Sequence, residues 1–165
     1  MNEGKKFEKD FKDSMPKSVW CYRFRDGTAS WNQNQENVRF QQTNICDFLV
    51  YANKLWLLEL KTTAGSSLPY SSLKSQRLKK SKLKQQIEML ETAGQHSGIV
   101  PGLVVNFRKF QETYFVHIDK IIHYLETEDR KSIAYKWFEE NGILIPQHRK
   151  KVNFTYELSD LFNII

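Results

Sequence analysis

Residues 45–61 of the chain read ICDFLVYANKLWLLELK, and this stretch decides the fold that the sequence predicts. Two apolar runs, at 45–51 and 55–61, are joined by the tripeptide ANK, a pattern that indicates a β-hairpin or a close pair of strands. Three charged side chains interrupt these otherwise apolar strands. Because charged residues are rare in apolar strands, the hairpin is the candidate functional site.

The three charged residues are Asp47 in the first run and Glu59 and Lys61 in the second. Glu59 and Lys61 are two apart, so they point to the same face of a strand, and pairing of the strands brings Asp47 beside Glu59. Two adjacent carboxylates repel each other, and a divalent cation relieves that repulsion. Hard oxygen ligands suit Mg²⁺, and a neighbouring lysine suits phosphodiester hydrolysis. The alternative interpretation is a structural salt bridge on a solvent-facing strand.

Outward from the hairpin, the remaining pattern predicts a mixed sheet flanked by helices in one domain spanning residues 1–165. The predicted order is α-β-β-β-α-β-β-α. A polar segment at 27–42 is an excursion from this core, and a segment of that length is often functional. Helices are expected at 3–14, 81–93, 121–125 and 133–138, further strands at 19–24, 98–107 and 114–118, a loop at 62–72, and a short turn or helix at 158–165.

Composition narrows the partner and the compartment. The 165 residues include 25 Lys and Arg against 19 Asp and Glu, a net charge of +6, which favours a polyanionic partner. No apolar run reaches the roughly 18 residues of a membrane span. Cys21 and Cys46 lie in apolar runs without metal-ligand spacing, which indicates buried thiols and a cytoplasmic location.

A basic segment follows the charged hairpin. Between Leu60 and Ile87 there is no acidic residue, so the positive charges there would repel one another without a polyanionic partner. A solvated helix face is the alternative interpretation, although such faces usually carry both signs of charge. A shorter basic run at 148–151 is consistent with ordinary surface. The candidate DNA-binding residues of the first segment are Lys74, Arg77, Lys79, Lys80, Lys82 and Lys84.

Several short motifs, taken in order, resemble the PD-(D/E)xK nuclease superfamily and, more closely, the RecU-type Holliday-junction resolvases of Gram-positive bacteria and their phages. They are G-x-x-F-E at 4–8, Y-R-F-R-D at 22–26, D-F at 47–48, L-E-L-K-T-T at 58–63 and Q-I at 86–87. The resemblance covers most of the chain. It implies a restriction-endonuclease-like core, with Cys46 where the superfamily's name has proline.

By that resemblance, Asp47 and Glu59 are metal ligands for Mg²⁺, with Mn²⁺ able to substitute, and Lys61 is the catalytic lysine. Glu8 would approach the metal from the first helix. Gln86 would approach the same site from the helix after the lysine strand, although the sequence leaves open whether Gln85 or Gln86 points inward. The segment at 27–42 falls where the family projects a stalk toward the junction centre.

The leading hypothesis is therefore a Mg²⁺-dependent endonuclease that resolves four-way DNA junctions. Trp31 and Arg39 in the 27–42 segment are candidate DNA contacts. A homodimer is expected because two opposed strands must be cut, and the aromatic surplus of Trp20, Tyr22, Phe48 and Trp56 is expected to contribute to its interface. The alternatives are another duplex nuclease of the superfamily, of restriction or repair type, and a DNA-binding recombination accessory factor that does not cut.

Overall fold

A computed structural model describes residues 2–24, 44–70 and 82–164 of the chain. These residues form helices and strands in the order α1 (Glu3–Asp13), β1 (Trp20–Arg23), β2 (Phe48–Ala52), β3 (Lys54–Thr63), β4 (Ser67–Pro69), α2 (Lys82–Gly94), β5 (Ile99–Phe107), β6 (Glu112–His117), α3 (Ile118–Thr127), β7 (Ser132–Ala134), α4 (Tyr135–Asn141), β8 (Ile143–Ile145), β9 (Gln147–Lys150), β10 (Asn153–Tyr156) and α5 (Ser159–Asn163).

The central sheet has the strand order β1-β2-β3-β5-β6-β8. Strands β3 and β5 pair in parallel, while the other neighbours in the sheet are antiparallel. A parallel pair needs a long crossover connection, and the chain between β3 and β5 supplies one that contains α2. The predicted mixed sheet and the hairpin at 45–61 are thereby confirmed.

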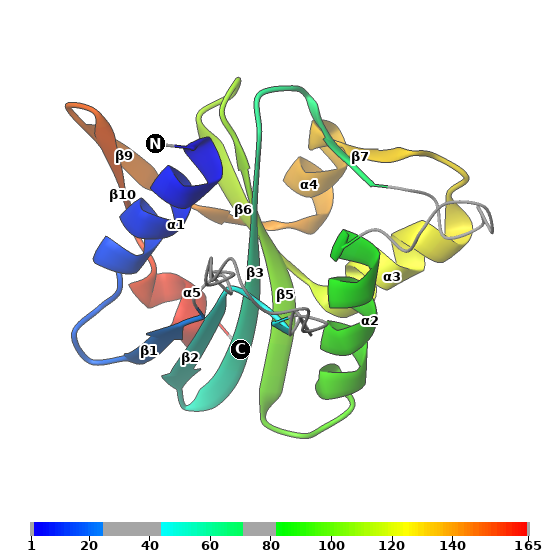
Figure 1. Cartoon of the computed structure of the whole chain (residues 1–165), viewed down its shortest axis with the longest axis horizontal. Coiled ribbons are helices and arrows are strands. Elements are labelled where there is room, and N and C mark those ends of the chain that lie inside the picture. The colour runs from blue at the N-terminus through cyan, green and yellow to red at the C-terminus, as the bar shows by residue number, and fades with distance from the viewer. Residues whose placement is uncertain (1, 25–43, 71–81, 165) are drawn as a thin grey trace, which may run out of the picture.

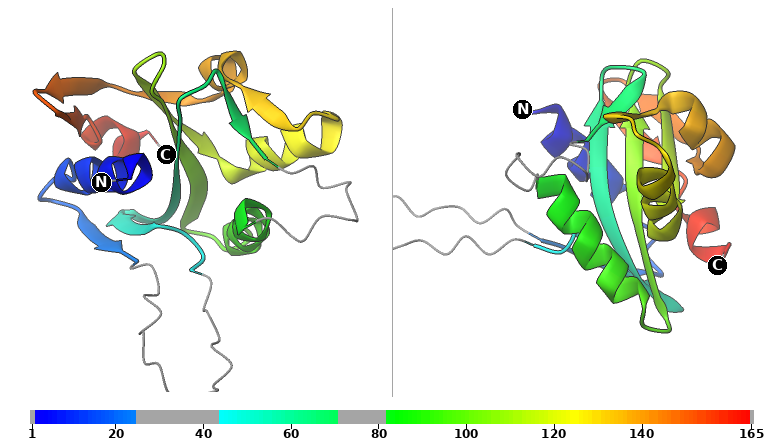
Figure 2. Two further views of the ribbon diagram at one scale, coloured as in Figure 1. Left: turned by 45° about the horizontal axis from the view of Figure 1, so that its top comes forward. Right: turned by 90° about the vertical axis from the view of Figure 1, so that its right-hand side faces the viewer.

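Helices cover both faces of the sheet (Figure 1; Figure 2). On one face, α1 and α5 lie against a core that contains Trp56, Leu58 and Leu60 of β3. On the other, α2 and α3 pack over a core that contains Leu57 of the same strand. The alternation along β3 therefore assigns the odd-numbered residues, including Glu59 and Lys61, to the α2 face.

The first helix forms where the sequence predicts it. The side chain of Asn2 caps it by accepting a hydrogen bond from the backbone N–H of Gly4 at 3.0 Å. Phe7 and Phe11 are four residues apart, so they fall on one face of the helix and are buried against the sheet. This burial packs α1 against β3 and β10, with the ring of Phe11 against that of Phe48 in β2.

Several short elements differ from the sequence prediction. The helix expected at 133–138 begins only at Tyr135, because residues 132–134 form β7, which pairs with β4 inside the loop expected at 62–72. Strands β8, β9 and β10 were not predicted either. Strands of three or four residues depend on a distant partner rather than on a local pattern, so their own sequence carries little signal.

The aromatic residues expected at an interface divide into two groups. Phe48 and Trp56 are fully buried in the core, so that part of the prediction is wrong. Their positions in β2 and β3, neighbours in the sheet, put both rings under α1 and α5. Trp20 and Tyr22 are about half exposed on the edge strand β1.

The polar segment at 27–42, including Trp31 and Arg39, lies outside the described residues. The same holds for Lys74, Arg77, Lys79 and Lys80 and for the side chain of Lys82. Within the described ranges, no helix combines the length and the apolar character that crossing a membrane requires.

Candidate active site

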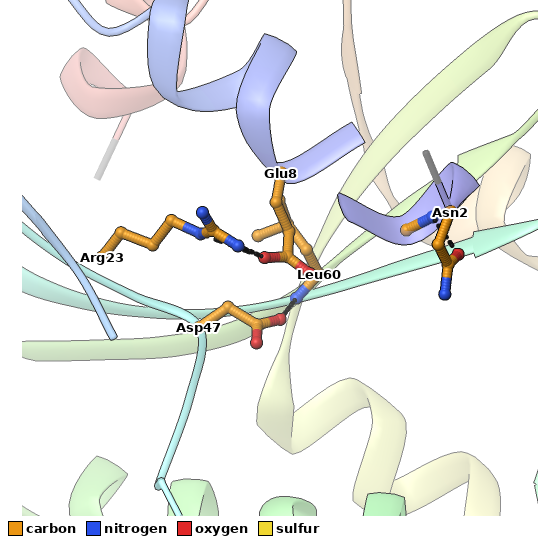
Figure 3. Close-up of polar contacts among 6 residues, drawn as sticks. Asn2, Glu8, Arg23, Asp47 and Leu60 are labelled. Carbon is orange, nitrogen blue, oxygen red and sulfur yellow. Dashed lines mark hydrogen bonds and ion pairs between the residues drawn. The ribbon is translucent and has the colours of Figure 1, made fainter. Parts of the chain in front are cut away.

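Asp47 lies at the point where β2 begins and is held against β3 by two hydrogen bonds. Its backbone N–H donates to the carbonyl of Leu58 at 3.1 Å, and its side-chain Oδ2 accepts from the backbone N–H of Leu60 at 2.8 Å (Figure 3). The register pairs Phe48 with Leu58, so Asp47 is next to Glu59 across the hairpin. The carboxylate of Asp47 thus takes a position in the ladder that a backbone carbonyl would otherwise occupy.

Glu59, Lys61 and Gln86 form the second part of the site. The Nζ of Lys61 is 2.5 Å from Oε1 of Glu59 and 3.5 Å from Oε1 of Gln86. Glu59 and Gln86 are only 1% and 2% exposed, whereas Gln85 lies in a groove beside α2. Of the two glutamines, Gln86 is therefore the one that points into the site.

Burial, and to a smaller extent the neighbouring charge of Asp47, raises the pKa of the Glu59 carboxyl to about 7. The positive charge of Lys61 and hydrogen bonds from Lys61 and Gln86 act against this rise. The second oxygen, Oε2, is buried without a hydrogen-bond partner in the part of the chain that is described. A buried, unpaired carboxylate oxygen is costly, and a cation is the natural partner for it.

Glu8 extends from α1 toward Asp47 (Figure 3). Its carboxylate accepts hydrogen bonds from the guanidinium of Arg23, with Nε at 3.0 Å. Arg23 is a site residue to which the sequence analysis assigned no role, although it stands in the Y-R-F-R-D motif. No three Asp, Glu, His or Cys side chains within residues 2–24, 44–70 and 82–164 are placed to hold a metal ion together. The fold thus unites Asp47 with Glu59, while Glu8 is held by Arg23.

The residues of the Asp47–Glu59 pair fit a magnesium ion. Mg²⁺ in proteins commonly takes only one or two carboxylates and completes its shell with waters and substrate phosphate oxygens. Asp47 and Glu59 would supply the two carboxylates, with the unpaired Oε2 of Glu59 as the atom that most needs a partner. Lys61, bonded to the other oxygen of Glu59, adds a positive charge beside the pair.

Of the basic residues expected to bind DNA, Lys84 is the one whose side chain the structure describes. Its Nζ lies 3.9 Å from the carboxylate of Glu88, one turn further along α2. This is an ordinary pair on a helix surface and contributes little energy. The assignment of Lys84 to DNA binding stays a prediction.

The raised pKa of Glu59 predicts how stability depends on pH in metal-free protein. Because the folded state raises the pKa from 4.5 to about 7, the stabilising contribution is full below pH 4.5 and is lost as the pH rises through 7. The loss amounts to about 3 kcal/mol at roughly 1.4 kcal/mol per pH unit. Urea unfolding in EDTA measures this loss. The free energy of unfolding of Glu59→Gln, relative to that of wild type, should rise between pH 4.5 and 8.

The difference in the free energy of unfolding between the two proteins isolates the effect of Glu59, because both proteins share every other titrating group. Added Mg²⁺ should reduce this difference at pH 8, because it stabilises only the wild type. Parallel stability curves for wild type and Glu59→Gln across this range would contradict the assignment of a buried, destabilised carboxylate.

This chain is similar to several known proteins. The family model described as Recombination protein U matches residues 28–159. The SPbeta prophage-derived uncharacterized protein YotM of Bacillus subtilis (strain 168) is 29% identical over 174 residues, which cover 97% of this chain and 85% of that protein. Hjc, a Holliday junction resolvase from Archaeoglobus fulgidus, superimposes with a TM-score of 0.47 at 12% identity, covering 76% of this chain and 82% of Hjc.

Proposed function

Because this chain belongs to the Recombination protein U family, we propose that it is a Mg²⁺-dependent endonuclease that resolves four-way DNA junctions. The observation that carries the chemistry is the pair of adjacent carboxylates, Asp47 and buried Glu59, with an unpaired oxygen and a lysine alongside. This arrangement is suited to phosphodiester hydrolysis, in which negative charge grows on phosphate oxygens.

Each side chain of the site has a distinct part in the proposed reaction. Asp47 accepts a hydrogen bond from the N–H of Leu60, which fixes the direction of its carboxylate. Lys61, positioned by Glu59 and Gln86, orients the attacking water and pairs with the scissile phosphate. When bound, Mg²⁺ supplies positive charge that stabilises the developing negative charge and makes a water at the site more acidic.

A cleavage assay tests the proposal directly. Purified protein is incubated with a synthetic four-way junction, or with linear duplex of the same sequence, in Mg²⁺ and in EDTA. We expect paired nicks in the junction in Mg²⁺, with little cutting of duplex and none in EDTA. Equal cutting of both DNAs would instead support a duplex nuclease of restriction or repair type. Junction binding without any cutting would support the accessory-factor alternative.

The choice of junction over duplex is proposed to come from the segment at 27–42. Contacts to phosphates alone cannot select a junction, because all DNA presents them. Arg39 and Trp31 in this segment would provide a phosphate contact and a ring to stack on an exposed base. A duplex nuclease with the same Asp47, Glu59 and Lys61 would have no need of such a segment.

The proposed active form is a homodimer, since two opposed strands must be cut and the described part of each chain holds one acidic pair at the site. Trp20 and Tyr22 stack with ring centroids 6.3 Å apart on the edge strand β1. Tyr51 of β2 stands opposite Trp20 in the register and is 57% exposed. Exposed aromatic groups of this kind are typical of interface cores.

The double variant Trp20→Ser, Tyr22→Ser is expected to shift the protein from dimer to monomer because it removes two of these three exposed rings. Sedimentation at micromolar concentration measures the change, with Leu144→Ser, also an exposed apolar residue but on β8 at the other edge, as the control. A monomeric wild type, or a double variant that remains dimeric, would rule out this interface.

A further inference from the structure

The hairpin of β9 and β10 carries a concentrated positive charge at its turn. Arg149, Lys150 and Lys151, named the basic turn here, are all exposed. No carboxylate among the described residues forms an ion pair with any of the three. The acidic residue beside the hairpin, Glu157, is paired with His148 at 2.6 Å at the base. The basic turn therefore has an unneutralised charge of three.

The hairpin is attached to α1 by bonds that fix its direction. The backbone N–H of Phe154 donates to Oδ2 of Asp10 at 2.9 Å, and that of Tyr156 donates to Oγ of Ser14 at 3.0 Å. These two side chains accept the hydrogen bonds that a further strand would otherwise accept from the outer edge of β10. The ring of Tyr156 also packs edge-on against Phe7, with centroids 5.5 Å apart. The hairpin and α1 consequently form one rigid unit.

Lys151 is not the residue that the geometry of the turn favours. Its φ of 55° lies in the left-handed region, where side chains other than those of glycine and asparagine are disfavoured. Residues held in this region against their preference are concentrated at functional sites. A lysine here is consistent with selection for its charge, because glycine would form the turn more easily.

Helix α1 connects the hairpin of the basic turn to the candidate active site. Asp10, which anchors the hairpin, is two residues after Glu8, which points toward Asp47. In Figure 1 the turn projects beyond α1 on the side of the molecule away from α2. DNA that leaves the site across α1 would therefore pass beside the basic turn.

We propose that the basic turn binds backbone phosphates of a duplex DNA arm that extends from the active site across α1. This inference rests on the proposed function, because it takes the partner to be the same DNA substrate. Charge-assisted contacts from Arg and Lys and the release of counterions from the duplex would supply the binding energy. Rigid attachment to α1 would align the bound arm with the carboxylate pair.

The test compares two triple variants in an Asp47→Asn background, where cutting cannot disturb the binding measurement. Both variants remove one Arg and two Lys from exposed positions, so they change the net charge equally. Their members are Arg149→Gln, Lys150→Gln and Lys151→Gln in the first, and Arg130→Gln, Lys131→Gln and Lys136→Gln near α4, across the sheet from α1, in the control. Affinity for a four-way junction is measured at several salt concentrations.

We expect the first variant to bind about ten- to a hundredfold more weakly near 0.1 M salt and its salt slope to fall by roughly two to three, since each phosphate contact contributes about 0.9. The control should change little. Equal losses in both variants would mean a general charge effect and would overturn the proposal, as would unchanged binding in the first.

The single variant Lys151→Gly separates charge from structure. It should melt at the same or a higher temperature, because glycine suits the left-handed conformation, yet it should bind DNA more weakly. Unchanged affinity in this variant would remove Lys151 from the contact. Failure of the wild type to cut any DNA would count against the proposed nuclease activity, whereas the binding comparison would still decide the role of the basic turn.

Discussion

Asp47→Asn or Glu59→Gln is expected to abolish DNA cleavage while leaving affinity for DNA within a few-fold of wild type. Each change removes one of the two carboxylates that would hold Mg²⁺, so the charge that stabilises the reacting phosphate is lost. The cleavage rate should fall by more than about a thousandfold, which exceeds the loss of about 10²–10³ that follows removal of one hydrogen-bond donor to a transition state. Single-turnover cleavage of a junction measures the rate, and binding in EDTA measures affinity.

The two substitutions preserve the local structure for different reasons. In Asp47→Asn the amide oxygen can still accept the hydrogen bond from the N–H of Leu60, so the start of β2 is retained. In Glu59→Gln a buried carboxylate with a raised pKa becomes neutral, which removes its desolvation penalty. Glu88→Gln on α2 is the matched control, since it removes a nearby carboxylate outside the pair. Normal cutting by pure Asp47→Asn protein would end the catalytic assignment.

The hairpin and its charged residues could be predicted because the signals are local. Alternation along β3 alone places Glu59 and Lys61 on one face, and the structure confirms this with their 2.5 Å contact. The short connection around Asn53 likewise makes the strands antiparallel and brings Asp47 to Glu59. The sequence could not choose between Gln85 and Gln86, because that choice depends on how α2 is rotated against β5.

The features that sequence analysis missed depend on distant partners. Arg23 meets Glu8 because β1 and α1 lie side by side at one edge of the sheet, and nothing within either segment indicates this pairing. Strand β10 is similar, since two of its N–H groups donate to Asp10 of α1 and to Ser14, the residue that caps the end of α1, more than 140 residues earlier in the chain. The run at 148–151, interpreted as ordinary surface, belongs to that hairpin.

Lys61→Ala is expected to lower the cleavage rate by about 10²–10³ with little loss of junction affinity, since the lysine acts at the reacting centre. The ammonium group also lowers the pKa of Glu59, so its removal leaves that carboxylate more readily protonated. Part of the loss could therefore come from competition between protons and Mg²⁺ for Glu59. Measuring the rate at saturating Mg²⁺ and at pH 8 removes this contribution and leaves the effect of Lys61 itself.

Lys54→Ala provides the control, because Lys54 lies on the same strand at the end far from the site. Lys61→Arg then distinguishes two roles for the charge. A guanidinium can pair with phosphate but does not give up its proton near neutral pH, so an active Lys61→Arg protein would indicate electrostatic pairing rather than proton transfer. Equal losses of affinity and rate in Lys61→Ala would make this residue a simple phosphate anchor, and the catalytic role proposed for it would be wrong.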